Sequence, residues 1–221
     1  SKIIMTNCSH FTVTQGVNLI GGGLVNEQDI NDIRKSGKSL FCADSGLNYA
    51  LKNNFLVSGL IGDLDSVGSQ KNATYPVLFD QSQDTNDLEK SLDVINAKYI
   101  ICYGFLGGRL DHSLASFNVI SKTKQVVFLI GEEDVCVVCP KNLKLNLPIG
   151  TRFALFPMDK TFAKSKGLMW NLDGILMSPN GRISTSNESI EKHIEIWIDD
   201  GLALAIFPRN TLPTIINQWP F

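Results

Sequence analysis

Residues 99–120 read Tyr-Ile-Ile-Cys-Tyr-Gly-Phe-Leu-Gly-Gly-Arg-Leu-Asp-His-Ser-Leu-Ala-Ser-Phe-Asn-Val-Ile. The stretch begins with an apolar run, Tyr99–Tyr103, and passes through a glycine-rich loop. It continues with Leu114, Phe117 and Ile120 at the spacing of one helix face. A strand that is apolar along its whole length is typical of a sheet that is covered on both faces. The stretch therefore predicts a strand, a loop and a helix that belong to a parallel sheet.

The same alternation of apolar runs and helical patterns extends over residues 17–130. The further predicted strands are Val17–Ile20, Leu40–Ala43, Val57–Ile61, Val77–Phe79 and Val126–Ile130. The further predicted helices are Glu27–Lys35, Gly46–Asn53 and Asp87–Ala97. Asn86 and Glu89 are suitably placed to cap the last of these helices. We therefore expect residues 1–134 to form an α/β domain, with a Rossmann-like parallel sheet and helices on both faces.

From Asp134 onward the pattern changes, because helical patterns largely stop and turns such as Pro179-Asn180-Gly181 separate short strand-like runs. These runs are Val135–Val138, Arg152–Pro157, Gly167–Leu172, Arg182–Ser184, His193–Trp197 and Leu202–Phe207. We expect residues 135–221 to form a second domain, an all-β sandwich of antiparallel strands. The boundary between the two domains is expected within residues 131–141.

The composition narrows the class of protein. With 221 residues, 43% of them hydrophobic and 19% charged, the chain has an ordinary globular balance. The net charge of −2 argues against a nucleic-acid binder, which needs a basic face. No apolar run reaches the ~20 residues of a membrane span, and Ser1–Asn18 lack a secretory pattern. The five scattered cysteines, Cys136 and Cys139 among them, are typical of reduced core residues, so we expect a cytoplasmic protein.

Aspartates follow the predicted strands with unusual regularity. Each of five groups lies just past a strand's C-terminal end, which is the edge where open α/β sheets bind ligands. The groups are Asp44, the pair Asp63 and Asp65, Asp80, the pair Asp84 and Asp87, and the segment Gly107–Asp111. Aspartate is also a common turn and capping residue, which explains any one group but explains five less well.

The pair Asp63 and Asp65 predicts a metal site. In an extended segment, residues two apart face the same side, and two carboxylates that face one point repel each other unless a cation lies between them. Magnesium suits such a site, because it accepts one or two carboxylates and completes its shell with water and phosphate oxygens. Asp87 is either a third ligand or a first-turn residue that stabilises its helix through the dipole.

The segment Gly107-Gly108-Arg109 predicts a phosphate contact. Glycines let the backbone approach an anion, the guanidinium binds phosphate oxygens in a fork, and the helix beginning near Asp111 adds its positive N-terminal end. The run Gly21–Gly23 is a weaker signal, since no Gly-Lys-Ser/Thr follows it. His112 receives little weight beyond helix capping or orientation.

One alternative enzyme class shares part of this pattern. Asp63-Leu64-Asp65-Ser66-Val67 fits the Asp-x-Asp-x-Thr/Val motif of haloacid-dehalogenase-like phosphatases, in which the first Asp, here Asp63, is the nucleophile. Those enzymes also use a later Gly-Asp-x-x-x-Asp pattern, which this sequence lacks, and here the pair follows the third predicted strand instead of the first. The phosphatase hypothesis is therefore the weaker one.

Taken in order, the motifs resemble those of the thiamine pyrophosphokinase family over nearly the whole chain. They are Ala43-Asp44-Ser45-Gly46, Gly62–Ser66, Asp84–Asp87 and Gly107–His112, followed by Gly167–Leu172 and Ser184–Glu188 in the second domain. Ser45 departs from the family's glycine at that position, and with Gln81-Ser82-Gln83 before Asp84 the nucleotide loop is expected to differ in detail from the family's.

The resemblance implies a magnesium-dependent homodimer, with each active site at the subunit junction, that transfers pyrophosphate from ATP to the hydroxyl of thiamine and releases AMP. It implies magnesium on Asp63, Asp65 and Asp87. The residues implied for ATP are Gln83, Asp84, Thr85, Gly107, Gly108 and Arg109. The residues implied for thiamine are Trp170, Ser186 and Asn187, with the Trp stacking from the partner subunit. A thiamine- or nucleotide-binding protein without catalysis is the third hypothesis.

Two assignments remain open between roles. Asp44 or Asp111 is expected to take the proton of the thiamine hydroxyl, or only to orient that hydroxyl. A Trp in the β domain is as often a residue of the sandwich core as a ligand contact. We expect Trp170 to contact the ligand because of the resemblance, and Trp197, in an alternating run, to lie in the core.

Overall fold

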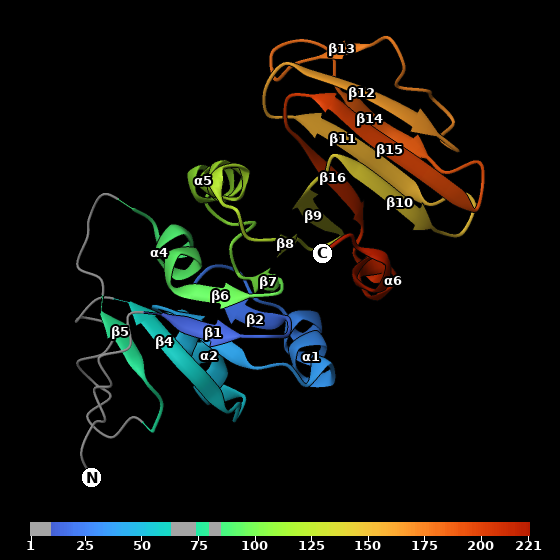
Figure 1. Ribbon diagram of the computed structural model, residues 1–221. Coiled ribbons are helices and arrows are strands. Elements are labelled where there is room, and N and C mark those ends of the chain that lie inside the picture. The colour runs from blue at the N-terminus through green and yellow to red at the C-terminus, as the bar shows by residue number, and fades with distance from the viewer. Residues whose placement is uncertain (1–9, 63–73, 80–84) are drawn as a thin grey trace. The chain divides into compact units, whose positions relative to one another are not determined.

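The computed structural model describes residues 10–62, 74–79 and 85–221. The chain divides into two compact units, Ser1–Ile130 and Gly131–Phe221, which together give a mixed α/β fold (Figure 1). None of the helices in the described parts has the length and apolar composition that crossing a membrane requires.

The first unit contains a parallel sheet. Its strands are β2 (Val17–Ile20), β3 (Leu40–Ala43), β4 (Val57–Gly62), β5 (Val77–Phe79), β7 (Ile100–Tyr103) and β8 (Val127–Ile130). They pair in the order β8-β7-β2-β3-β4-β5, and every pairing is parallel. All four residues of β2, β3, β7 and β8 are buried, as the apolar runs predicted. The six predicted strands are confirmed to within one residue at each end.

Four helices of this unit follow the predicted pattern, α1 (Glu27–Ser36), α2 (Gly46–Lys52), α4 (Asp87–Val94) and α5 (Leu110–Lys122). Their ends are set by local chemistry. Asn26 and Asp29 form a reciprocal capping box at the start of α1, and Gly37, at φ 60°, ends it. The predicted cap of α4 is confirmed on one side, since Asn86 Oδ1 accepts a hydrogen bond from Glu89 N at 2.9 Å.

The helix predicted over Asp87–Ala97 is too long. It ends at Val94, and Ile95–Ala97 form a short strand, β6, which pairs in parallel with β1 (Phe11–Val13). Neither strand was predicted. β-branched Val94 and Ile95 favour extended backbone. Pairing with Phe11–Val13, more than eighty residues earlier in the chain, stabilises the strand instead of a longer helix.

The second unit is built from antiparallel strands. They are β9 (Asp134–Val138), β10 (Asn142–Asn146), β11 (Arg152–Pro157), β12 (Thr161–Lys166), β13 (Leu176–Met177), β14 (Ser184–Glu188), β15 (His193–Asp200) and β16 (Ala203–Pro208). Within this unit the pairings run β14-β11-β16-β9 and β10-β15-β12-β13. The strand expected at Gly167–Leu172 is wrong, because that segment is a loop with a single bridge, Leu168 to Ser189.

Other expectations for this unit also need correction. Strands β10, β12 and β13 were not predicted, and the expected strand Arg182–Ser184 begins only at Ser184. Helical structure does not stop, since a 3-10 turn, η1 (Arg209–Thr211), leads into α6 (Leu212–Gln218) near the end of the chain.

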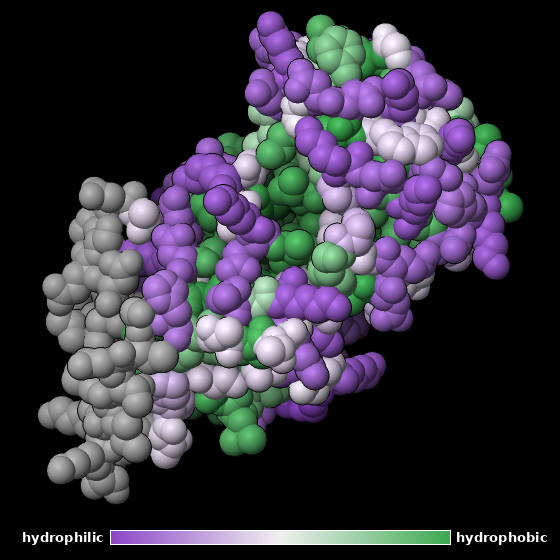
Figure 2. Space-filling view, viewed as in Figure 1, coloured by the Kyte–Doolittle hydropathy of each residue, from purple (hydrophilic) through white to green (hydrophobic). Residues whose placement is uncertain are grey.

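Trp197 lies on the outward face of β15, not in the core. Ile194, Ile196 and Ile198 take the buried positions, and the alternation of a strand places Trp197 on the other face, the face of Glu195. The Lys166 ammonium lies 5.4 Å from the centre of its ring. Hydrophilic side chains predominate on this face of the unit in Figure 2.

The four described cysteines are free and buried, which confirms Cys136 and Cys139 as core residues. Burial raises the pKa of Cys42, Cys136 and Cys139 to about 12, and also raises the pKa of Cys102. Because the thiolate is the reactive form, we expect none of these four to react with a maleimide or an aromatic disulfide at pH 8 in the native protein. Mass spectrometry of labelled peptides measures this, with the unfolded chain as the control. Rapid native labelling of any of the four would contradict the burial.

Candidate active site

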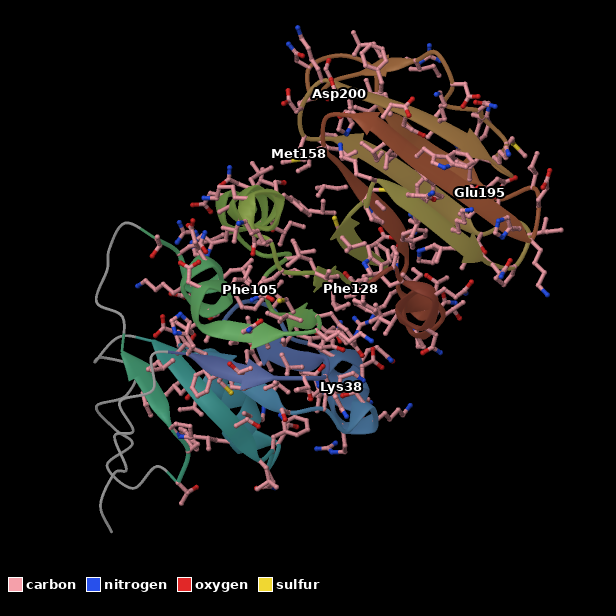
Figure 3. The ribbon with its side chains drawn as sticks, in the orientation of Figure 1. Lys38, Phe105, Phe128, Met158, Glu195 and Asp200 are labelled. Atoms are coloured by element: carbon pink, nitrogen blue, oxygen red, sulfur yellow. The ribbon has the colours of Figure 1, made fainter. Side chains whose placement is uncertain are left out.

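A cavity of about 610 Å³ lies within the first unit, at the carboxyl ends of its parallel strands. Its lining comes from the loops after β2, β3 and β7, from α2, and from the N-terminal parts of α4 and α5. The lining residues are Gly22, Gly23, Leu24, Ser45, Tyr49, Asn86, Asp87, Leu88, Gly104, Phe105, Gly107, Gly108, Arg109, His112, Ala115 and Ser116. Phe105, in the loop after β7, is labelled in Figure 3.

The strand order explains why a cavity forms here. Strand β2 lies between β3 and β7. After β2 the chain builds β3, β4 and β5 on one side, and it then returns to build β7 and β8 on the other. The loops that leave β2 and β7 therefore diverge, and the crevice between them is the topological switch point where open α/β sheets bind ligands.

Gly22 and Gly23, from the run Gly21–Gly23 that carried little weight in the sequence, line the cavity. A Cβ on Gly22 would overlap the Oγ of Ser45, so only glycine fits against Ser45 without displacing it. Gly23 N donates to Gly104 O at 3.0 Å, and the Tyr49 hydroxyl donates to Gly23 O at 2.8 Å. The sequence feature that could have identified these glycines is their position directly after β2, which lies inside the sheet between β3 and β7.

The loop Gly107-Gly108-Arg109 forms another part of the lining. Gly107 and Gly108 have φ angles of 82° and 65°, in the left-handed region that glycine adopts without strain. Gly107 N donates to Ser113 Oγ at 3.1 Å, which ties the loop to the first turn of α5. Leu24 packs over both glycines, 3.5 Å from the position of a Cβ on either.

Arg109 and Asp111 form a bidentate ion pair. Arg109 Nε donates to Asp111 Oδ1 at 3.1 Å and Nη2 donates to Oδ2 at 2.6 Å, while the backbone N–H of His112 donates to Oδ1 at 3.1 Å. Arg109 lines the cavity and Asp111 does not. The pair uses the Nε side of the guanidinium and leaves the Nη1 side for a ligand.

The hydrogen bonds from Arg109 lower the pKa of Asp111. A carboxylate with a lowered pKa is a weak proton acceptor near neutral pH, so this geometry favours Asp111 as an orienting group over Asp111 as a base. His112, which received little weight in the sequence, lines the cavity from the first turn of α5.

Asp87, the first residue of α4, lines the cavity beside Asn86. Because Asn86 caps the helix, the Asp87 carboxylate is not needed as a cap. Thr85 is described but is not part of the lining.

Asp44 is half-buried and lies at the end of β3, with φ 45° and its N–H donating to Ile61 O at 2.8 Å. Its carboxylate packs against Gly62, where a Cβ would overlap Oδ1. Asp44 thus lies next to the residue that precedes Asp63, although it is not part of the cavity lining.

Four predicted site residues, Asp63, Asp65, Gln83 and Asp84, lie outside the described residues. Within the described ranges, His, Cys, Asp and Glu side chains form no group of three or more that is placed to hold a metal ion.

A second cavity, of about 350 Å³, lies within the second unit. It is lined by Met169, Trp170, Asn171, Leu172, Ile175, Met177, Arg182, Ile183, Ser184, Thr185 and Asn187. Trp170 is 57% exposed beside it, and Asn187 is buried. Ser186 adopts φ 54° and is not part of the lining. The structure therefore brings Trp170 and Asn187 together, with apolar neighbours that the sequence did not single out.

Two family models match the chain. The model for the catalytic domain of thiamin pyrophosphokinase matches residues 30–129, and the model for its vitamin B1 binding domain matches residues 138–203. Among curated relatives, thiamine pyrophosphokinase 3 of rice (Oryza sativa subsp. japonica) is 32% identical over 66% of this chain and 69% of its own length. Rice thiamine pyrophosphokinase 1 is 33% identical over 67% of this chain and 65% of its own length. Thiamine pyrophosphokinase 1 of Arabidopsis thaliana is 28% identical over 83% of each chain.

Solved structures share the fold. Thiamine pyrophosphokinase from Bacillus subtilis superposes with a TM-score of 0.72 at 19% identity, over 88% of this chain and 99% of that one. Yeast thiamin pyrophosphokinase superposes with a TM-score of 0.70 at 16% identity, over 97% of this chain and 95% of that one. With two family models matched in order and relatives above 30% identity, this chain belongs to the thiamine pyrophosphokinase family.

Proposed function

We propose that this chain transfers the pyrophosphoryl group of ATP to the hydroxyl of thiamine, giving thiamine diphosphate and AMP. The observation that carries the proposal is the cavity at the switch point of the parallel sheet. It gathers a carboxylate from Asp87, the left-handed loop Gly107-Gly108 and the guanidinium of Arg109. Carboxylate, backbone N–H and guanidinium together are the groups that bind a metal-associated polyphosphate.

The proposed division of labour follows the two units. Residues 1–134, as a Rossmann-like domain, bind the nucleotide and the metal, and residues 135–221, as a β-sandwich, bind thiamine. The descriptions of the two matched family models, a catalytic domain and a vitamin B1 binding domain, support this division. Trp170 provides an exposed indole face for stacking on a flat cationic ring, and Ser186 and Asn187 belong to the same proposed thiamine site.

Asp63, Asp65 and Asp87 are proposed to hold magnesium. The donors are all carboxylate oxygens, which suits this ion. Asp87 lines the cavity, and the carboxylate of Asp44 lies against Gly62, the residue before Asp63, which supports an acidic site at this edge of the sheet. When bound, the ion neutralises the charge of the phosphate oxygens.

The chain's own groups have separate proposed tasks. Gln83, Asp84 and Thr85 contact the nucleotide, and the loop Gly107-Gly108 admits its phosphates close to the backbone. Arg109 stabilises the negative charge that spreads over the transferred group. Asp44 is the candidate that accepts or orients the proton of the thiamine hydroxyl, since Asp111 is engaged by Arg109.

The protein is proposed to act in the cytoplasm as a homodimer whose active sites lie at the subunit junction. Large apolar side chains exposed around the second cavity support an interface there, since Met169, Trp170 and Ile183 are 45%, 57% and 39% exposed.

The experiment is an incubation of the purified chain with ATP, magnesium and thiamine, followed by chromatography of all products. Equal amounts of AMP and thiamine diphosphate are expected. Inorganic phosphate released from a phosphomonoester without an acceptor, through a trappable phosphate on Asp63, would instead support the phosphatase. Calorimetric binding of thiamine or ATP with no product would support the binding protein.

A further inference from the structure

We propose that Asn187 is a positioning residue that holds Trp170 in place beside the second cavity. The inference rests on the proposed function in one respect, the assignment of the flat cationic ring of thiamine to Trp170. Its structural part, the attachment of Trp170 to the sheet through Asn187, stands independently of that assignment.

The segment around Trp170 begins as a short antiparallel ladder and then leaves it. Ile190 N donates to Gly167 O at 2.8 Å and Met169 N donates to Glu188 O at 2.9 Å, on either side of the bridge between Leu168 and Ser189. An antiparallel pair would next return a bond from Glu188 N to Met169 O. Glu188 N donates instead to the side chain of Asn187.

The carboxamide of Asn187 replaces the missing part of the ladder. Its Oδ1 accepts hydrogen bonds from Glu188 N at 2.9 Å and from Trp170 N at 3.1 Å. Its Nδ2 donates to Trp170 O at 2.8 Å. One side chain therefore binds both main-chain polar groups of Trp170, as a peptide group of a neighbouring strand would do.

The anchor of this clamp is rigid. Asn187 is 1% exposed, and its main chain pairs with Phe153 of β11, which is fully buried. Trp170, by contrast, is 57% exposed, so packing alone restrains its indole weakly. The position from which the indole projects is thus set by Asn187, and through Asn187 by the buried strand β11.

This attachment matters for binding. If binding has to order an aromatic side chain, the lost side-chain entropy lowers the affinity for the ligand. A side chain that is held in place beforehand avoids this cost. The clamp favours flat cationic heteroaromatic ligands that stack on an indole. The Asn187 carboxamide is already engaged: Oδ1 accepts from Trp170 N and Glu188 N, and Nδ2 donates to Trp170 O. Asn187 therefore acts through Trp170 more than by touching the ligand.

The first test labels the three tryptophans with 5-fluorotryptophan and compares the ¹⁹F spectra of the wild type, Asn187→Ala and Asn187→Asp without any ligand. Trp170→Phe identifies the resonance of Trp170. In both Asn187 variants this resonance is expected to shift and to change in width, while those of Trp197 and Trp219 stay in place. Asn187→Asp keeps the two accepted bonds and loses the donor, so it serves if the alanine variant fails to fold. The control is Asn180→Ala, which removes the acceptor of the Ser178 hydroxyl in an exposed turn.

The second test measures steady-state kinetics. For Asn187→Ala, the KM for thiamine is expected to rise by about tenfold, with kcat and the KM for ATP within about twofold of the wild type. An unmoved Trp170 resonance in both variants overturns the clamp. A moved resonance with KM for thiamine unchanged, or with both KM values raised equally, overturns the positioning role. Absence of any thiamine turnover in the wild type refutes the proposed function instead, and the ¹⁹F result remains interpretable.

Discussion

Replacing Arg109 with alanine is expected to lower kcat/KM for pyrophosphoryl transfer by about 10²–10³-fold. Arg109 lines the first cavity, and its Nη1 side is left for phosphate oxygens by the pairing with Asp111. Because the charge that it neutralises grows during the reaction, kcat should fall together with kcat/KM. Steady-state kinetics with ATP and thiamine measures both. The control is Arg34→Ala, an exposed arginine of α1, with kcat/KM expected within about twofold of the wild type.

Asp111→Asn is expected to cause a smaller loss, of about tenfold, because the amide keeps one acceptor but cannot hold the guanidinium by two charged bonds. If Asp111 acts only through Arg109, the double variant should be no slower than Arg109→Ala alone. A loss from Asp111→Asn that is as large in the Arg109→Ala background as in the wild type would contradict this. It would mean that Asp111 touches the reaction directly.

The pH profile separates the same two roles. Hydrogen bonds from Arg109 lower the pKa of Asp111, so the paired carboxylate persists above that pKa and is lost only as the pH falls through it. A general base produces the acid limb of kcat/KM at its own pKa. We therefore expect Asp111→Asn to leave the acid limb near neutral pH where it is in the wild type. Disappearance of that limb in the variant would identify Asp111 as the base.

The strands of the parallel sheet could be predicted because each one is marked by its own run of apolar residues. Strands such as Val17–Ile20 and Leu40–Ala43 are buried at every position, so their residues are mostly apolar, with Asn18 as the exception, and the runs stand out in the sequence. The end of α4 could not be predicted in this way. Ile95 leaves the helix because Phe11 offers a strand partner, and that neighbour is remote in the chain.

Strand β12 illustrates a different obstacle. Its buried positions hold Thr161, Ala163 and Ser165, whereas Phe162 is 45% exposed. Polar and small side chains face inward because they have partners there. For example, the Ser165 hydroxyl accepts from Leu172 N and the Thr161 hydroxyl donates to Leu202 O. A pattern based on hydrophobicity places such a strand in the wrong register or misses it.

The candidate site also has a part that could be predicted from the sequence and a part that could not. Strand-end position was enough to select Asp87 and Gly107-Gly108-Arg109, which line one cavity. The sequence could not distinguish a side chain that faces a ligand from one that holds its neighbour. Asp111 and Asn187 were both predicted to serve the reaction or the ligand; in the structure Asp111 binds Arg109, and Asn187 binds the main chain of Trp170.

Asp87→Asn is expected to reduce turnover by about 10²–10³-fold while the fold stays intact. Asp87 lines the cavity and is proposed to share magnesium with Asp63 and Asp65, so its replacement removes a negative charge from the proposed polyphosphate site. The amide is nearly the same size and shape. Helix α4 keeps its cap, since Asn86 Oδ1 accepts from Glu89 N independently of Asp87.

The competing role of Asp87, stabilisation of the helix dipole, predicts another outcome. Loss of one first-turn charge costs about 0.3–1 kcal/mol of unfolding free energy and leaves turnover unchanged. Glu89→Gln is the matched control, because Glu89 is an acidic residue of the same turn that pairs with Lys122 at 2.9 Å and does not line the cavity. Chemical denaturation of both variants gives the stability change, which should be similar for the two.

Magnesium titration then distinguishes a ligand from any other charged group. If Asp87 binds the ion, the magnesium concentration for half-maximal activity should rise in Asp87→Asn and remain at the wild-type value in Glu89→Gln. The two variants would thus share a small loss of stability and differ in turnover and in metal dependence. Wild-type turnover in Asp87→Asn would leave Asp87 as a first-turn residue of α4. The proposed metal site would then have to be completed by another carboxylate, and Asp44, packed against Gly62, is a described candidate.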